Sequence, residues 1–205
     1  MKDWSQIAQA ADPDEVRERI LTGYRAGKPF TPYVPTIALP HPLGTVLDFG
    51  CGLGRNFPYL TKIADKVTGF DLPPMIERCR ALADQPIALL TSDWDLLRAR
   101  RFDLVVATLV LQHIDAAACE GYVRDAARIA PAMYLLSRVR SDDDVNVLDA
   151  ILKTGAFEGG PCVAVEHDEG THQLRVLGIR PVEEVRAASD GGHYEVLLRS
   201  TRFAR

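Results

Sequence analysis

A glycine-rich segment at residues 46–56, with the sequence VLDFGCGLGRN, is the strongest chemical signal in the chain. A short, mostly apolar stretch leads into Gly50, Gly52 and Gly54. Glycine lets the backbone turn sharply and approach a ligand closely, and the free N–H groups that open a following helix bind polar or anionic groups. The segment therefore predicts a nucleotide-binding loop at the carboxyl end of a first buried strand. The alternative is a tight strand-to-helix turn whose glycines serve packing only.

Two further acidic residues follow apolar stretches that we expect to be strands. Asp71 comes one helix and one strand after the glycines. A carboxylate at this place can accept hydrogen bonds from both hydroxyls of a ribose, although it could also cap the helix that begins near Pro73. Asp93 and Trp94 follow the next strand, where the indole could supply an apolar wall.

The elements that must position these residues alternate between strand and helix. We expect strands at residues 45–49, 66–70, 86–90, 102–108 and 132–138, and helices at 57–63, from 73 or 74, at 116–130 and at 142–153. This alternation predicts an α/β fold with a doubly wound, Rossmann-like, mostly parallel sheet. Residues 162–166, 171–177 and 193–200 alternate apolar and polar side chains, which predicts antiparallel C-terminal strands. The pattern does not decide which of these three strands is extra.

The N-terminal part of the chain differs from the rest. Asp12 and Pro13 predict the start of a helix that runs to about residue 24. Prolines at positions 29, 32, 35, 40 and 42 then predict an extended strap, because proline interrupts regular elements. We therefore expect a helix and strap over residues 1–44, a possible lid, followed by the main domain over 45–205.

Composition limits the classes of function. The chain has 205 residues and a net charge of −4, which disfavours nonspecific binding to nucleic acid or anionic membranes. No apolar stretch is long enough for a membrane-spanning helix, and no secretory signal is visible, so we expect a cytoplasmic protein. The four cysteines lack metal-site spacing and are expected to be reduced thiols, with no metal site.

The order of these motifs resembles that of the class I S-adenosylmethionine-dependent methyltransferases. The GxGxG spacing, with Asp48 two residues before Gly50, resembles the first motif of that superfamily, and the GRN at 54–56 resembles its small-molecule branches. A dinucleotide fingerprint would instead read GxGxxG, so a nicotinamide enzyme is disfavoured. Residues 102–114, FDLVVATLVLQHI, resemble the fourth strand of the family and its following turn. The resemblance covers about residues 45–140.

The resemblance implies S-adenosylmethionine as the cofactor and assigns roles to the motif residues. Asp71 would hold the ribose, Leu72 would cover the adenine, and Asp93 would accept a hydrogen bond from the adenine amino group. Thr108 and Leu109, at the end of the fourth strand, would lie beside the methionine part of the cofactor. The expected cofactor-binding residues are Asp48, Gly50, Cys51, Gly52, Gly54, Arg55, Asn56, Asp71, Leu72, Asp93, Trp94, Thr108 and Leu109.

The implied activity is methyl transfer to a small-molecule acceptor by direct displacement, in which the protein aligns the reactants and excludes water. His113 is the candidate catalytic base, but in the resembled family the matching histidine more often supports the loop. Two alternatives stay open: a catalytically silent cofactor-binding subunit, and an enzyme acting on a macromolecule. Residues 107–110 lack the pattern of amino-methylating DNA enzymes, so no nucleic-acid substrate is expected. The acceptor and the oligomeric state are not determined.

Overall fold

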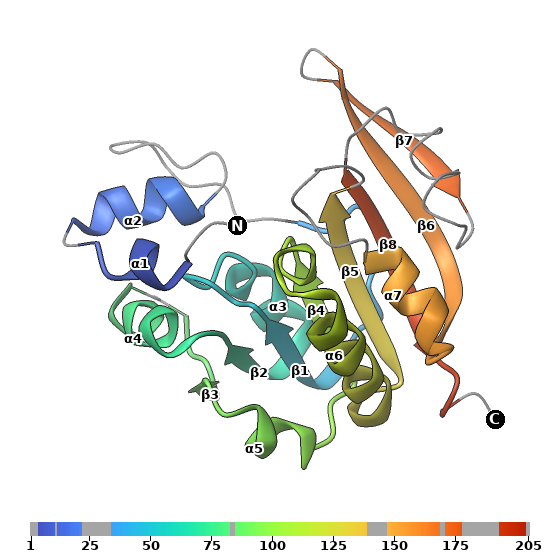
Figure 1. Ribbon diagram of the computed structural model, residues 1–205, viewed down its shortest axis with the longest axis horizontal. Coiled ribbons are helices and arrows are strands. Elements are labelled where there is room, and N and C mark those ends of the chain that lie inside the picture. Colours follow the sequence, from blue (N-terminus) through green and yellow to red (C-terminus); the bar gives the residue numbers. More distant parts are fainter. Residues whose placement is uncertain are drawn as a thin grey trace.

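A computed structural model of the chain describes residues 4–10, 12–21, 34–82, 85–138, 147–168, 171–177 and 193–203. Its centre is an eight-stranded sheet in the order β3-β2-β1-β4-β5-β8-β6-β7 (Figure 1). The strands are β1 (Leu43–Phe49), β2 (Ala64–Phe70), β3 (Leu89–Thr91), β4 (Leu104–Thr108), β5 (Ala132–Arg138), β6 (Phe157–Asp168), β7 (Thr171–Leu177) and β8 (His193–Ser200). The first five strands pair in parallel, and the last three pair antiparallel.

Helices cover both faces of this sheet. They are α1 (Trp4–Ala8), α2 (Pro13–Ile20), α3 (Phe57–Ile63), α4 (Pro73–Leu82), α5 (Trp94–Arg98), the 3-10 turn η1 (Leu111–His113), α6 (Ala116–Ile129) and α7 (Val147–Thr154). Successive side chains of a strand point to opposite faces of the sheet, so each central strand contributes side chains to a hydrophobic core on each face. Leu47 and Val105 pack on the side of α6 and α7, whereas Val46 and Val106 pack on the side of α3 and α4. No helix among the described residues is long and apolar enough to cross a bilayer.

The predicted α/β fold, with its mostly parallel sheet and antiparallel C-terminal strands, is confirmed. The third strand begins later than predicted: β3 lies at 89–91 rather than 86–90, because pairing with β2 begins only where Leu89 meets Thr68. The bounds of several other strands also differ from the prediction by a few residues. The chain order of the C-terminal strands is not their spatial order. β8 lies between β5 and β6, and β7 forms the outer edge of a hairpin that extends away from the body (Figure 1).

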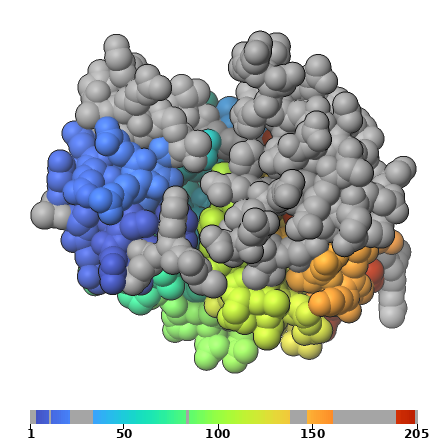
Figure 2. Space-filling view, turned by 45° about the horizontal axis from the view of Figure 1, so that its top comes forward, coloured from blue at the N-terminus to red at the C-terminus, as the bar shows by residue number. Residues whose placement is uncertain are grey.

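The N-terminal helices are bound to the main domain. Asp12 caps α2 as expected, since its side chain accepts from the Asp14 amide at 2.9 Å. Arg78 of α4 donates to the carbonyl oxygens of Ala8 and Ala10, at 3.3 and 2.7 Å. These contacts place α1 and α2 against α4, where they form one outer surface of the molecule (blue in Figure 2).

Much of the expected strap, residues 22–33, lies outside the described residues, as do the end of the first predicted helix and the start of the helix predicted at 142–153. The described end of the strap is anchored to the last strand. Glu195 of β8 is buried and accepts hydrogen bonds from the Thr36 hydroxyl and from the amides of Thr36 and Ile37. The division into segments 1–44 and 45–205 stays a prediction.

Candidate cofactor site

The glycine loop turns at the carboxyl ends of β1 and β2. The amides of Gly50 and Cys51 both donate to the carbonyl oxygen of Phe70, at 2.8 and 3.0 Å, so the loop is fixed to the end of β2. Gly50 and Gly54 have φ angles of 71° and 82°. An added Cβ would lie 2.3 Å from the side chain of Val110 at Gly50, and 2.4 Å from the ring of Phe57 at Gly54. Both positions therefore require glycine for conformation and for space.

Three polar side chains join β1, α3 and β4 beneath this loop. The side-chain amide of Asn56 donates to Asp48 Oδ1 and to Thr108 Oγ1, both at 2.9 Å. Asp48 and Asn56 are buried, at 0% and 4% exposure. Asn56 stands immediately before α3, so it connects the first turn of that helix to the ends of two strands.

Two oxygens of this group accept no hydrogen bond from the described part of the chain. Among the described residues, no donor reaches Oδ2 of Asp48 or Oδ1 of Asn56, although both atoms are buried. Burial raises the pKa of Asp48 to about 7; the hydrogen bond from Asn56 opposes this shift, and the charge of Asp71 adds to it. Buried polar atoms are normally hydrogen-bonded, so these two acceptors indicate a donor from water or from a ligand.

Asp71 stabilises the glycine loop. Its Oδ2 accepts from the amide of Gly52 at 2.8 Å, and its Oδ1 accepts from the amide of Leu72 at 2.7 Å. Burial raises the pKa of Asp71, and these two hydrogen bonds oppose that shift. Each carboxylate oxygen keeps a second lone pair for a ligand. Leu72, at 45% exposure, stands open to solvent beside the loop.

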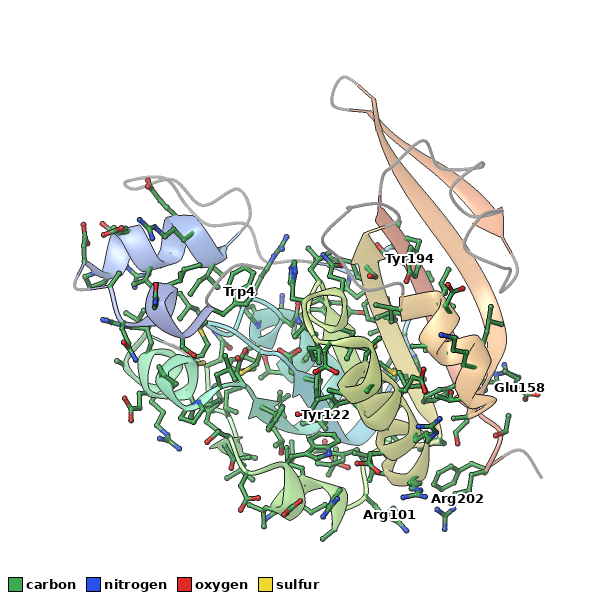
Figure 3. All side chains as sticks on the ribbon, viewed as in Figure 1. Trp4, Arg101, Tyr122, Glu158, Tyr194 and Arg202 are labelled. Carbon is green, nitrogen blue, oxygen red and sulfur yellow. The ribbon has the colours of Figure 1, made fainter. Side chains whose placement is uncertain are left out.

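The two residues that follow β3 point in different directions. Asp93 is exposed and caps α5, because its side chain accepts from the Leu96 amide at 3.0 Å. The indole of Trp94 donates to Asp125 Oδ2 at 3.0 Å and packs with the rings of Phe49, Phe70 and Tyr122. Trp94 therefore belongs to an aromatic cluster on the α6 side of the sheet. Tyr122, a member of this cluster, is labelled in Figure 3.

The chain takes a strained conformation where β4 ends. Leu109 has a φ of 55°, which is rare for a residue with a side chain, and its amide donates to the carbonyl of Leu136 at 2.8 Å. Such strain concentrates at functional sites. Beyond Leu109, the ring of His113 packs against that of Trp4 at a centroid distance of 5.3 Å. Figure 3 shows Trp4 directed from α1 toward the centre of the molecule.

The structure brings most of the expected residues together at one edge of the sheet. The glycine loop, including Cys51 and Arg55, lies with Asp48, Asn56, Asp71, Thr108 and Leu109 at the carboxyl ends of β1, β2 and β4. Ligands of open α/β sheets bind at this edge. Asp93 and Trp94 follow β3 at the same edge, but Asp93 bonds the first turn of α5, and the indole N–H of Trp94 bonds Asp125 of α6.

Sequence reasoning missed three residues near His113. Gln112 and Ser137 are both buried and hydrogen-bonded to each other at 2.9 Å, and Trp4 belongs to a helix that no motif indicates. The only available signal was a glutamine inside the otherwise apolar segment that precedes His113. Within the described residues, no three His, Cys, Asp or Glu side chains are grouped so that they could hold a metal ion.

Comparison with known proteins gives a consistent result. Residues 46–131 match the family model of a methyltransferase domain. No curated protein matches the chain. The N-methyltransferase NodS from Bradyrhizobium japonicum, solved with S-adenosyl-l-homocysteine, has a TM-score of 0.55 at 16% identity, over 78% of this chain and 79% of NodS.

Two further solved structures have a similar fold. A TehB-like SAM-dependent methyltransferase from Corynebacterium glutamicum has a TM-score of 0.53 at 17% identity, over 80% of this chain and 83% of its own. Magnesium protoporphyrin IX methyltransferase from Synechocystis, with bound SAM, has a TM-score of 0.50 at 16% identity, over 78% and 70%. At these identities the likeness concerns the fold.

Proposed function

We propose that this chain, of which residues 46–131 match the family model of a methyltransferase domain and whose fold is similar to that of S-adenosylmethionine-dependent methyltransferases, transfers the methyl group of S-adenosylmethionine to a small-molecule acceptor. The observation that carries the proposal is the glycine loop at the carboxyl ends of β1 and β2, braced by Asp71 and backed by two buried oxygen atoms without donors among the described residues.

The residues of the site fit this cofactor. The loop packs so closely that no Cβ fits at Gly50 or Gly54, where it would meet Val110 or Phe57. Its amides at Gly50 and Gly52 donate to Phe70 and Asp71, which fixes the shape of the loop at the carboxyl ends of the strands. Asp71 has lone pairs left for the ribose hydroxyls. The two oxygens of Asp48 and Asn56 that have no donor in the described part of the chain suit a group rich in N–H donors, such as the ammonium of the methionine part, either directly or through a water.

We propose cofactor contacts for other residues at this edge of the sheet as well. Leu72 is exposed beside Asp71 and can cover the adenine, and Asp93 follows β3 within the same sheet edge. Thr108 and Leu109 end β4 next to Asn56. Trp94 packs its ring on Phe49 and Phe70, near the ends of β1 and β2, and its indole N–H is bound to Asp125. We therefore infer that it supports the site and does not line it.

When bound, the cofactor supplies a methyl group on sulfur with a neutral thioether as leaving group. The protein then has to align the acceptor with that methyl group and exclude water. Leu109, whose amide donates to the carbonyl oxygen of Leu136, follows the end of β4 in its strained conformation. The N-terminal helices are held beside this region, because Trp4 packs on His113 and Arg78 donates to the carbonyl oxygen of Ala10. We infer that residues 1–44 act as a lid on this side.

Several observations favour a small acceptor. NodS is an N-methyltransferase, and the Synechocystis enzyme methylates magnesium protoporphyrin IX. The net charge of −4 disfavours a nucleic-acid acceptor. A catalytically silent cofactor-binding subunit and an enzyme acting on a macromolecule are the competing candidates.

Titration calorimetry tests the first part of the proposal. We expect S-adenosylmethionine and S-adenosylhomocysteine to bind with dissociation constants on the order of micromolar, or about −8 kcal/mol, and NAD to give no heat. Binding of NAD alone would overturn the assignment. Formation of S-adenosylhomocysteine with a panel of amine and hydroxyl acceptors then separates an enzyme from a silent subunit, for which binding would persist without turnover.

A further inference from the structure

Three polar side chains connect β5 to the loop after β4, and the cofactor site does not use them. Ser137 Oγ donates to Gln112 Oε1 at 2.9 Å, and Gln112 Nε2 lies 3.5 Å from His113 Nε2. Ser137 and Gln112 are each 1% exposed. We call these three residues, Ser137, Gln112 and His113, the polar row.

The direction of the hydrogen bonds in the polar row follows from the chemistry of the amide group. An amide oxygen only accepts and an amide nitrogen only donates. Because Oε1 of Gln112 accepts from Ser137, its nitrogen faces His113 as a donor. A donor beside His113 Nε2 requires a lone pair there rather than a proton, and a neutral imidazole carries its single proton on the other nitrogen.

We propose that Gln112 is a positioning residue that holds His113 as the Nδ1–H tautomer, with Ser137 fixing the orientation of the amide. The lone pair at Nε2 is then occupied, so His113 carries its proton at Nδ1 and does not act as a base through Nε2. The ring of Trp4 packs against the imidazole at a centroid distance of 5.3 Å, which restricts rotation of the imidazole ring. The tautomer is a property of the folded chain, whereas its use in methyl transfer depends on the proposed function.

Nitrogen-15 NMR of protein labelled at histidine tests the tautomer directly. At alkaline pH, where imidazoles are neutral, the protonated and unprotonated ring nitrogens have well-separated shifts. Nε2 is identified by its couplings to both carbon-bound ring protons. The signal that disappears in His113→Asn belongs to His113. We expect Nε2 to be the unprotonated nitrogen in the wild type.

Substitution of Gln112 should change this state in a defined direction. Gln112→Met keeps the length of the side chain but removes the donor, and we expect the Nδ1–H preference to fall about fivefold, the equivalent of one net hydrogen bond of about 1 kcal/mol. Gln112→Glu replaces the donor by an acceptor and should move the proton to Nε2. Ser137→Ala should weaken the preference less than Gln112→Met does. Gln85→Met, far along the chain on the approach to β3, is the matched control and should change nothing.

The outcomes separate this inference from the proposed function. A protonated Nε2 in the wild type, unchanged in Gln112→Met, would overturn the inference, since it would mean that the amide has the opposite orientation. If Gln112→Glu does not fold, Gln112→Met still decides, provided that its circular dichroism and its other histidine signals match the wild type. Calorimetry with S-adenosylmethionine reports on the proposed function independently: cofactor binding with the wrong tautomer refutes only the inference, and the right tautomer without binding refutes only the function.

Discussion

Asn56 and Asp48 are joined by a hydrogen bond of 2.9 Å between two buried side chains, one immediately before α3 and the other in β1. The same amide nitrogen also reaches Thr108 at the end of β4. The side chain of Asn56 therefore links three elements: β1, which leads into the glycine loop, α3, which follows the loop, and the end of β4, which the strained Leu109 follows.

Replacing Asn56 should therefore weaken the whole site. Asn56→Leu leaves Asp48 Oδ1 buried without its donor, and we expect the free energy of unfolding to fall by about 1–3 kcal/mol. Urea denaturation measures this loss. Thr61→Ala removes a hydroxyl that bonds the Phe57 carbonyl in the same helix, away from Asp48, and is the matched control. A loss no larger than that of Thr61→Ala would show that the Asn56 hydrogen bond does not support the site.

Asp48 should make stability depend on pH. Its pKa is about 7 in the folded protein, above the value of 3.8 for an unperturbed aspartate. Between about pH 4 and pH 7 the folded state retains a proton that the unfolded state has released, so stability is highest below this window and falls as pH rises through it. The full loss is on the order of 4 kcal/mol.

Asp48→Asn removes this titration and keeps a similar shape. Denaturation at about pH 5 and about pH 8 should show the variant gaining stability relative to wild type at the higher pH. Parallel changes in the two proteins would mean that Asp48 is ionised in the folded state throughout.

The glycine loop should not tolerate a side chain at Gly50. Gly50→Ala combines a φ of 71° with a clash against Val110, and we expect a loss of about 2–5 kcal/mol together with weaker cofactor binding. Gly155→Ala is the matched control, because Gly155 has a φ of 57° but nothing within 4 Å of an added Cβ; its loss should be about 1 kcal/mol. Equal losses would show that the conformation alone, and not the contact with Val110, requires glycine.

Asp71 should matter for binding more than for folding. We expect Asp71→Ala to weaken binding of S-adenosylmethionine roughly ten- to a hundred-fold, because hydrogen bonds to a charged group contribute about 1.5–3 kcal/mol. Calorimetry measures the change, and Asp65→Ala, an exposed acid at the opposite end of β2, is the control. If Asp71→Ala bound S-adenosylmethionine as tightly as the wild type, Asp71 would serve only to hold the amide of Gly52.

His113 should contribute little to the chemical step. We expect His113→Ala to lower turnover by less than about a hundred-fold, since alignment of the reactants carries most of the rate and a positioned base adds about 10²–10⁴. Turnover is measured as S-adenosylhomocysteine formed with the first acceptor that the panel identifies. A loss above about a thousand-fold with intact cofactor binding and fold would make His113 the base.

The sequence by itself determined the fold class and the cofactor loop, because both depend on local patterns. The alternation of short apolar strands with helices predicted the parallel sheet, and the glycines with Asp48 and Asp71 predicted the loop and its acid. These residues lie within single strand-to-helix turns, where spacing along the chain fixes spacing in space.

The tertiary structure alone decided which distant side chains meet. No sequence pattern places Trp4 on His113, Ser137 on Gln112, or Glu195 on Thr36, because these pairs come from elements that are separated along the chain and joined only by packing. The same reason explains why the order of the C-terminal strands could not be predicted: antiparallel pairing puts β8 between β5 and β6, and chain order carries no information about which edge is open.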